Sequence, residues 1–139
     1  MSGRADPGST PRPAAGGTVR TARQQAGDRA EALALQALSA RGWQPVARNV
    51  RCRAGEIDLV MRDGDTLVFV EVRHRRRTEF GGAAASVDAA KRQRLLKAAQ
   101  WWLLGRYGQR AWPVCRFDVV AFDADDRMQW LPGAFDADG

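Results

Sequence analysis

The sequence predicts an α/β protein in which one mixed β-sheet is flanked by helices. Three observations support this class: a stretch of strong helix formers comes first, three β-rich stretches follow it, and a second helical stretch precedes one more β-rich stretch. The chain of 139 residues has about the length of one domain. The predicted order is therefore α-β-β-β-α-β within a single domain.

The first helix is predicted over residues 24–41. Residues 28–40 are strong helix formers, and Gly42 follows them, where a glycine that ends a helix is typical. The apolar side chains gather on one arc, and Glu31 falls inside that arc. A carboxylate is costly to bury without a partner, so Glu31 either reaches water at the margin of the arc or takes part in a polar site.

Three strands are predicted next, because alternating and β-branched residues dominate the sequence there. They cover residues 46–53, 56–62 and 66–75. Asp63 and Gly64 separate the second strand from the third, and Asp-Gly is a preferred centre of a two-residue hairpin turn. We therefore expect these two strands to pair antiparallel.

A second helix is predicted over residues 87–104, with Asp88 as its N-cap, and a last strand over 115–122. The first half of this helix is crowded with basic side chains, whereas apolar residues later in the helix can pack on the sheet. The predicted sheet thus has helices before and after its first three strands.

The chain divides into three parts by composition. Residues 1–23 are rich in Arg, Gly and Pro and are expected to form a flexible extension, because they cannot bury enough apolar surface to offset the entropy of ordering. Residues 24–123 form the predicted domain, and residues 124–139 form an acidic C-terminal segment. The net charge is +6, yet residues 28–116 alone hold 17 basic and nine acidic side chains. A basic surface on the folded part indicates a polyanionic partner.

Two classes of protein are disfavoured. No apolar run approaches the ~20 residues of a membrane-spanning helix, and the N-terminal residues lack the apolar core of a secretory signal. We therefore expect a cytoplasmic protein without a membrane partner. Cys52 and Cys115 lie far apart in the sequence and are expected to be free thiols.

Two acidic residues of the predicted hairpin can share one site. With the turn at the Asp-Gly dipeptide, Asp58 lies opposite Phe69 and is a diagonal neighbour of Glu71, with Arg73 on the same face. Carboxylates this close in apolar strands raise each other's pKa unless a cation lies between them. Oxygen ligands of this kind favour Mg²⁺ or Mn²⁺. The alternative is that both acids are strand-end charges paired with arginines.

Two basic runs, residues 73–77 and 91–97, flank the proposed acidic site. Charge runs are often only solvated faces. Beside a metal site, however, guanidinium groups can hold phosphates while the metal activates water, which is the chemistry of phosphodiester hydrolysis.

Several short motifs occur in order along residues 24–122: Gly27-Asp28-x-Ala30-Glu31, Arg48-Asn49, Gly55-Glu56-Ile57-Asp58-Leu59-Val60, Phe69-Val70-Glu71-Val72-Arg73, and Val87 spaced before Lys91. Together these motifs resemble the YraN family of small bacterial proteins. That family is similar in turn to the PD-(D/E)xK nucleases, whose restriction-endonuclease-like fold includes archaeal Holliday-junction resolvases.

The resemblance implies a restriction-endonuclease-like αβββαβ core with a catalytic metal site. By position, Asp58, Glu71 and the backbone carbonyl of Val72 would bind the metal, and Glu31 would be the helix-borne acid that reaches it. Arg73 completes the catalytic set but stands where the motif has lysine. Arginine stays protonated and cannot act as a general base, although it could orient the attacking water.

The expected function is a Mg²⁺- or Mn²⁺-dependent endonuclease acting on branched or single-stranded DNA, with DNA favoured over RNA. A homodimer would suit cleavage of both strands at a junction. The alternative, supported by Arg73, is a nucleic-acid-binding module of the same fold with weak or absent cleavage. A protein-interaction adaptor is supported only by the acidic C-terminal segment and by Trp130, which is expected to be exposed. The expected nucleic-acid contacts are Arg53, Arg75, Arg76, Arg77, Lys91 and Arg94.

Overall fold

The computed structural model describes residues 21–74 and 88–135. Within them lie two helices and five strands: α1 (Ala22–Ala40), β1 (Gln44–Cys52), β2 (Gly55–Asp63), β3 (Thr66–His74), α2 (Ala89–Tyr107), β4 (Val114–Phe122) and β5 (Met128–Phe135). The predicted restriction-endonuclease-like αβββαβ core is confirmed, and β5 follows it. Most of the predicted flexible extension lies outside the described residues.

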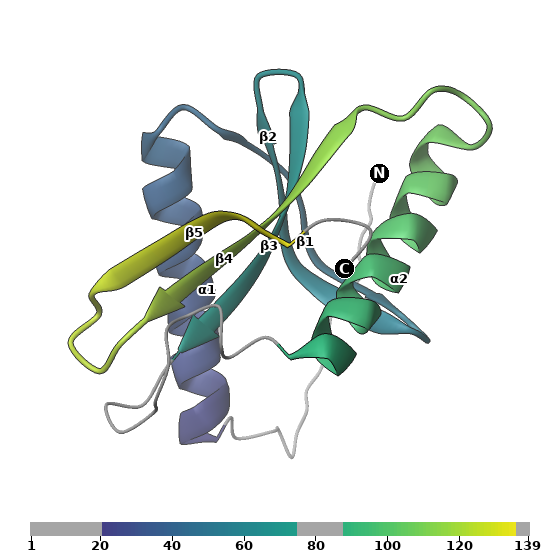
Figure 1. Ribbon diagram of the computed structural model, residues 1–139. Helices are drawn as coiled ribbons and strands as arrows, with labels where there is room; N and C mark the ends of the chain where they lie inside the picture. Colours follow the sequence, from purple (N-terminus) through teal and green to yellow (C-terminus); the bar gives the residue numbers. More distant parts are fainter. Residues whose placement is uncertain (1–20, 75–87, 136–139) are drawn as a thin grey trace, which may run out of the picture.

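The strands form one mixed sheet in the order β1-β2-β3-β4-β5. Strands β3 and β4 are parallel, and the other neighbours are antiparallel. Helix α2 connects the two parallel strands, which a tight turn could not do. Figure 1 shows α1 and α2 beside different parts of the sheet, and each covers its own core. The predicted mixed sheet flanked by helices is thus confirmed.

Helix α1 begins with a capping box. The Thr21 side chain accepts a hydrogen bond from the Gln24 N–H, and the Gln24 side chain accepts one from the Thr21 N–H. The small side chains of Ala30 and Ala34 then let the helix lie close to the sheet, and Leu38 is buried in the same core. The helix therefore holds Glu31, next to Ala30, near the sheet.

Helix α2 covers the other face. Its predicted N-cap is confirmed, because the Asp88 side chain accepts a hydrogen bond of 2.9 Å from the Lys91 N–H. Leu95, Ala98 and Leu103 are buried in the core on this side, together with Phe69 from β3. This packing fixes the first turns of α2 against the sheet.

The hairpin between β2 and β3 differs by one residue from the prediction. Asp63 pairs with Thr66, so the two-residue turn is Gly64-Asp65 and the predicted Asp63-Gly64 turn is wrong. Gly64 has a φ of +61°, and a positive φ at the first central residue alone is the pattern of a type II′ turn. Moving the turn by one residue moves each cross-strand partner by two, so every side chain keeps its predicted face.

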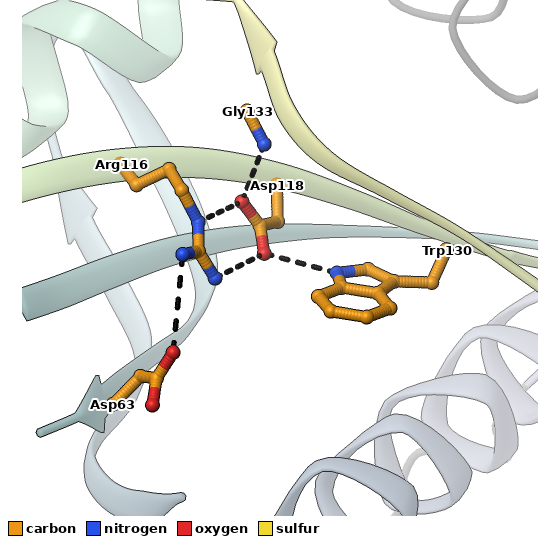
Figure 2. A network of polar contacts seen from close by, with 5 residues as sticks. All are labelled: Asp63, Arg116, Asp118, Trp130 and Gly133. Atoms are coloured by element: carbon orange, nitrogen blue, oxygen red, sulfur yellow. Dashed lines mark hydrogen bonds and ion pairs between the residues drawn. The ribbon is translucent and has the colours of Figure 1, made fainter.

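Strand β5 is fastened to β4 by a buried carboxylate. Asp118 on β4 is 1% exposed, and Figure 2 shows its side chain accepting hydrogen bonds from Arg116, from the Trp130 Nε1–H and from the Gly133 N–H. Because Asp118 is buried, losing these donors would leave its carboxylate without the partners that offset its desolvation. The expectation of an exposed Trp130 is wrong: its ring is partly buried and meets the Trp43 ring edge-on.

The sheet divides at one end. Pairing between β2 and β3 ends at Leu59 and Val70, although β3 stays paired with β4 to its last residue and β2 stays paired with β1 to its first. We call this place the fork; Asp58 and Glu71 are the next residues beyond the last pair. In Figure 1 the β1–β2 turn lies toward α2, while the end of β3 lies toward α1.

Candidate active site

Asp58 and Glu71 meet at the fork. The Val72 N–H, beyond the last β2–β3 pair, donates a hydrogen bond of 2.8 Å to Asp58 Oδ2. The Asp58 side chain thus accepts the hydrogen bond that a backbone carbonyl of a paired strand would otherwise accept. Glu71, next to Val72, is 4% exposed. The sequence prediction that the two acids lie close together agrees with this geometry. The observed register would place them opposite each other rather than diagonally, one position beyond the last β2–β3 pair.

Burial and mutual repulsion both act on this acid pair. Desolvation, and after it the charge of the neighbouring Asp58, raise the pKa of Glu71 to about 8. Burial also raises the pKa of Asp58, against the hydrogen bond from Val72. At pH 7 and without a cation, the pair therefore retains a proton.

Two cations contact Glu71 Oε2 from different elements. The guanidinium of Arg73 on β3 and the ammonium of Lys91 on α2 each lie 3.4 Å from this oxygen. The predicted proximity of Arg73 to the acid pair is therefore found. Lys91 was predicted only as a nucleic-acid contact, and its position on the acid pair was missed. One feature of the sequence could have drawn attention to Lys91: lysine is rare in this chain, which has two lysines against 20 arginines.

Glu31 approaches the acid pair from α1. Its side chain is neither fully solvated nor buried in the core, and desolvation raises its pKa to about 7. The charge of Asp58 is the next cause, and Arg48 acts in the opposite direction. The helix-borne acid thus lies within electrostatic reach of Asp58.

A divalent cation fits the acid pair by chemistry. Hard carboxylate oxygens that repel each other in a buried place are suited to Mg²⁺ or Mn²⁺. Over residues 21–74 and 88–135, no three His, Cys, Asp or Glu side chains converge closely enough to hold an ion by themselves. Asp58 and Glu71 would therefore be the two protein side chains that hold it, with Glu31 close by. The structure places the N–H of Val72 at the site. The Val72 carbonyl stays a predicted ligand of the metal.

The predicted nucleic-acid contacts separate into two sets. Arg53, Lys91 and Arg94 line one pocket of about 360 Å³ between the β1–β2 turn and α2. Arg75, Arg76 and Arg77 lie outside the described residues. The basic surface that the structure shows therefore reaches the acid pair through Lys91.

Other expectations from the sequence concern the thiols and the membrane. Cys52 and Cys115 are free and partly buried, as predicted. Neither described helix is long and apolar enough to cross a membrane.

The raised pKa of Glu71 predicts a pH-dependent gain in stability for Glu71→Gln in EDTA. The folded protein binds this proton more tightly than the unfolded chain, so wild-type stability falls as pH rises from about 4.5 to about 8. Glutamine cannot ionise and avoids that loss. We expect equal stability at pH 5 and a variant more stable by at least ~1 kcal/mol at pH 8, measured by urea unfolding. Asp65→Asn, at the exposed hairpin turn, is the control: it keeps Glu71, so its stability should fall between pH 5 and pH 8 as in wild type. A Glu71→Gln variant that loses stability between pH 5 and pH 8 as steeply as wild type would contradict the assignment.

Comparison with known proteins places this chain in a family. The model of the uncharacterised protein family UPF0102 matches residues 30–122. A UPF0102 protein of Stutzerimonas stutzeri is 53% identical over 82% of this chain and 97% of its own length. One from Janthinobacterium sp. is 54% identical over 85% of this chain and 93% of its own length. One from Bordetella petrii is 56% identical over 81% of this chain and 70% of its own length. The chain therefore belongs to the UPF0102 family, the family that the YraN resemblance indicated.

Proposed function

We propose that this protein is a Mg²⁺- or Mn²⁺-dependent endonuclease that hydrolyses phosphodiester bonds in branched or single-stranded DNA. One observation carries the proposal: Asp58 and Glu71 are held together at the fork with raised pKa values, and two cations contact Glu71. Perturbed acids in company with fixed cations are typical of catalytic sites.

Each residue of the site has a distinct role in this proposal. Asp58 and Glu71 would hold the metal ion, which when bound would polarise the phosphoryl oxygen and lower the pKa of water. Glu31, with a pKa of about 7, is suited to accept or donate a proton near neutral pH. Lys91 offers a compact positive charge with three N–H donors, which can orient the attacking water.

Arg73 would hold the phosphate rather than take part in proton transfer. Its guanidinium stays charged and presents paired donors that match phosphate oxygens. The lysine that the nuclease motif has at this position is replaced in space by Lys91, which contacts the same carboxylate oxygen. The exchange of lysine for arginine on β3 therefore leaves an ammonium group at the site.

The choice of DNA rests on the resemblance to nucleases and on the basic surface. Residues 28–116 carry the excess of positive charge, and part of it lines the pocket beside the acid pair. A DNA substrate agrees with the cytoplasmic location expected from the sequence. Cleavage of both strands at a junction would favour a homodimer.

The alternative function is a nucleic-acid-binding module of the same fold that cuts weakly or not at all. Arg73 in the motif position supports it, because arginine cannot act as a base. The position of Lys91 on Glu71 supports cleavage instead.

The proposal is tested with purified protein and labelled branched, duplex and single-stranded DNA in Mg²⁺, Mn²⁺ or EDTA. We expect cleavage of branched or single-stranded DNA in either metal and none in EDTA. Asp58→Asn and Glu71→Gln should lower the rate at least about 100-fold, the upper range for disturbed metal sites. Asp65→Asn removes an exposed acid from the turn of the same hairpin and should cut like wild type.

Two results would contradict the endonuclease proposal. Cleavage that survives both substitutions at the fork would show that the acid pair is not the site. DNA binding without cleavage under every metal condition would favour the binding module.

The exchange of roles between Arg73 and Lys91 gives a separate prediction. Lys91→Met should lower cleavage roughly 100-fold, as for other donors to transition-state charge, whereas Arg73→Lys should preserve it. Lys97→Met is the matched control, because Lys97 is exposed on the same helix. Initial rates at saturating Mg²⁺ measure the effect. A strong gain of activity in Arg73→Lys, with no loss in Lys91→Met, would instead place the functional lysine position on β3.

A further inference from the structure

We propose that the pocket between the β1–β2 turn and α2 binds the terminal phosphate of a single nucleic-acid strand. The preferred substrate class would then be single-stranded DNA with a phosphorylated end. The inference rests on the proposed function only for the claim that the bound strand is cut.

The pocket is formed by two backbone segments that touch each other. A methyl group at Gly55 would lie 2.5 Å from the backbone oxygen of Arg94, so only glycine permits the β1–β2 turn to approach α2 this closely. This contact fixes the distance between turn and helix, and with it the shape of the pocket. The volume of about 360 Å³ is near the lower end of the ~300–1,000 Å³ of ligand pockets. It suits a phosphate with its sugar rather than a duplex. The lining residues are Arg51, Cys52, Arg53, Ala54, Gly55, Glu56, Lys91, Arg94 and Leu95.

The charges of the pocket favour an anion. Four cationic side chains and one carboxylate line it. Glu56 forms an ion pair of 3.6 Å with Arg51, and Lys91 contacts Glu71 outside the pocket. In the described part of the chain, no acidic side chain pairs with the guanidinium of Arg53 or Arg94. Two guanidinium groups beside one concave surface, without an acidic partner among residues 21–74 and 88–135, are suited to phosphate oxygens.

The amount of charge distinguishes an end from a continuous strand. A phosphodiester within a strand carries one negative charge, whereas a phosphomonoester carries about −1.5 to −2 at pH 7. The pocket lining has an excess of three positive charges, and two of them, on Arg53 and Arg94, remain when the pairing of Lys91 with Glu71 is counted. A terminal phosphate therefore matches it better than an internal one.

The pocket shares a wall with the acid pair. Lys91 lines the pocket while its ammonium lies 3.4 Å from Glu71 Oε2. Glu56, also in the lining, precedes Asp58 by two residues on β2. A strand whose end is held in the pocket would thus have its neighbouring phosphates beside the proposed metal site.

Cys52 allows the pocket to be observed directly. The chain has two cysteines, so Cys115→Ser leaves Cys52 as a single partly buried thiol in the pocket lining. The rate at which a small thiol reagent modifies Cys52 then reports occupancy. The probes are oligothymidylates with a 5′-phosphate, a 3′-phosphate or two hydroxyl ends, together with thymidine monophosphate and inorganic phosphate.

All measurements are made in EDTA, so that no cleavage takes place. We expect one phosphorylated oligonucleotide to protect Cys52 and, by fluorescence anisotropy, to bind at least about tenfold more tightly than the form with hydroxyl ends. Arg53→Gln and Arg94→Gln should remove this preference. Arg23→Gln removes an exposed arginine of α1 outside the pocket and should retain it.

Three outcomes would overturn the inference: equal affinity for phosphorylated and hydroxyl ends, a preference that survives both pocket substitutions, or equal protection by inorganic phosphate or the mononucleotide. The last would make the pocket a small-anion site. A phosphate preference without metal-dependent cleavage would overturn only the proposed function, and cleavage without a phosphate preference would overturn only this inference.

Discussion

The hydrogen bond from the Val72 N–H to Asp58 is the interaction on which the candidate site depends. Where β2 and β3 stop pairing, backbone groups of β3 lose their strand partner, and a buried N–H must find another acceptor. The Asp58 side chain supplies it. This hydrogen bond holds Asp58 in a partly buried position next to Glu71. Without it, repulsion would favour separation of the two carboxyl groups. The raised pKa values of both acids follow from that placement. The fork is therefore both a structural solution for the backbone and the origin of the unusual electrostatics.

Much of the fold could be predicted because helices and strands leave local patterns in a sequence. The features that were wrong or missed depend on distant contacts. The hairpin turn is set by the pairing of two whole strands, so its dipeptide alone did not place it. Strand β5 contains Pro132 and Gly133, which disfavour strands, and it is held by Asp118 from β4. No local sequence pattern indicates that Asp118 holds β5 in place. Nor does any local pattern indicate that a hydrogen bond to Asp118 keeps Trp130 partly buried.

The candidate site also has a part that the sequence predicted and a part that depends on distant contacts. Alternation along β2 and β3 was enough to place Asp58 and Glu71 on one face, because a two-residue change of partner preserves the face. The contact of Lys91 with Glu71 depends on where α2 packs, and the close approach of Gly55 to Arg94 helps to set that position. Such a contact between a helix and a strand has no signature in sequence spacing. It also changes how Arg73 is interpreted. Arg73 stands where the motif has lysine, but the ammonium group of Lys91 contacts the same carboxylate oxygen.

We propose that the acid pair exchanges its proton for a divalent cation. Isothermal titration of Mn²⁺ into the protein at pH 7, in buffers of different ionisation enthalpy, measures the protons released on binding. With a Glu71 pKa of about 8, we expect roughly one proton to be released for each ion bound. The release should decline toward pH 9 and disappear in Glu71→Gln. Binding without proton release at pH 7, or a release that Glu71→Gln leaves unchanged, would contradict the account.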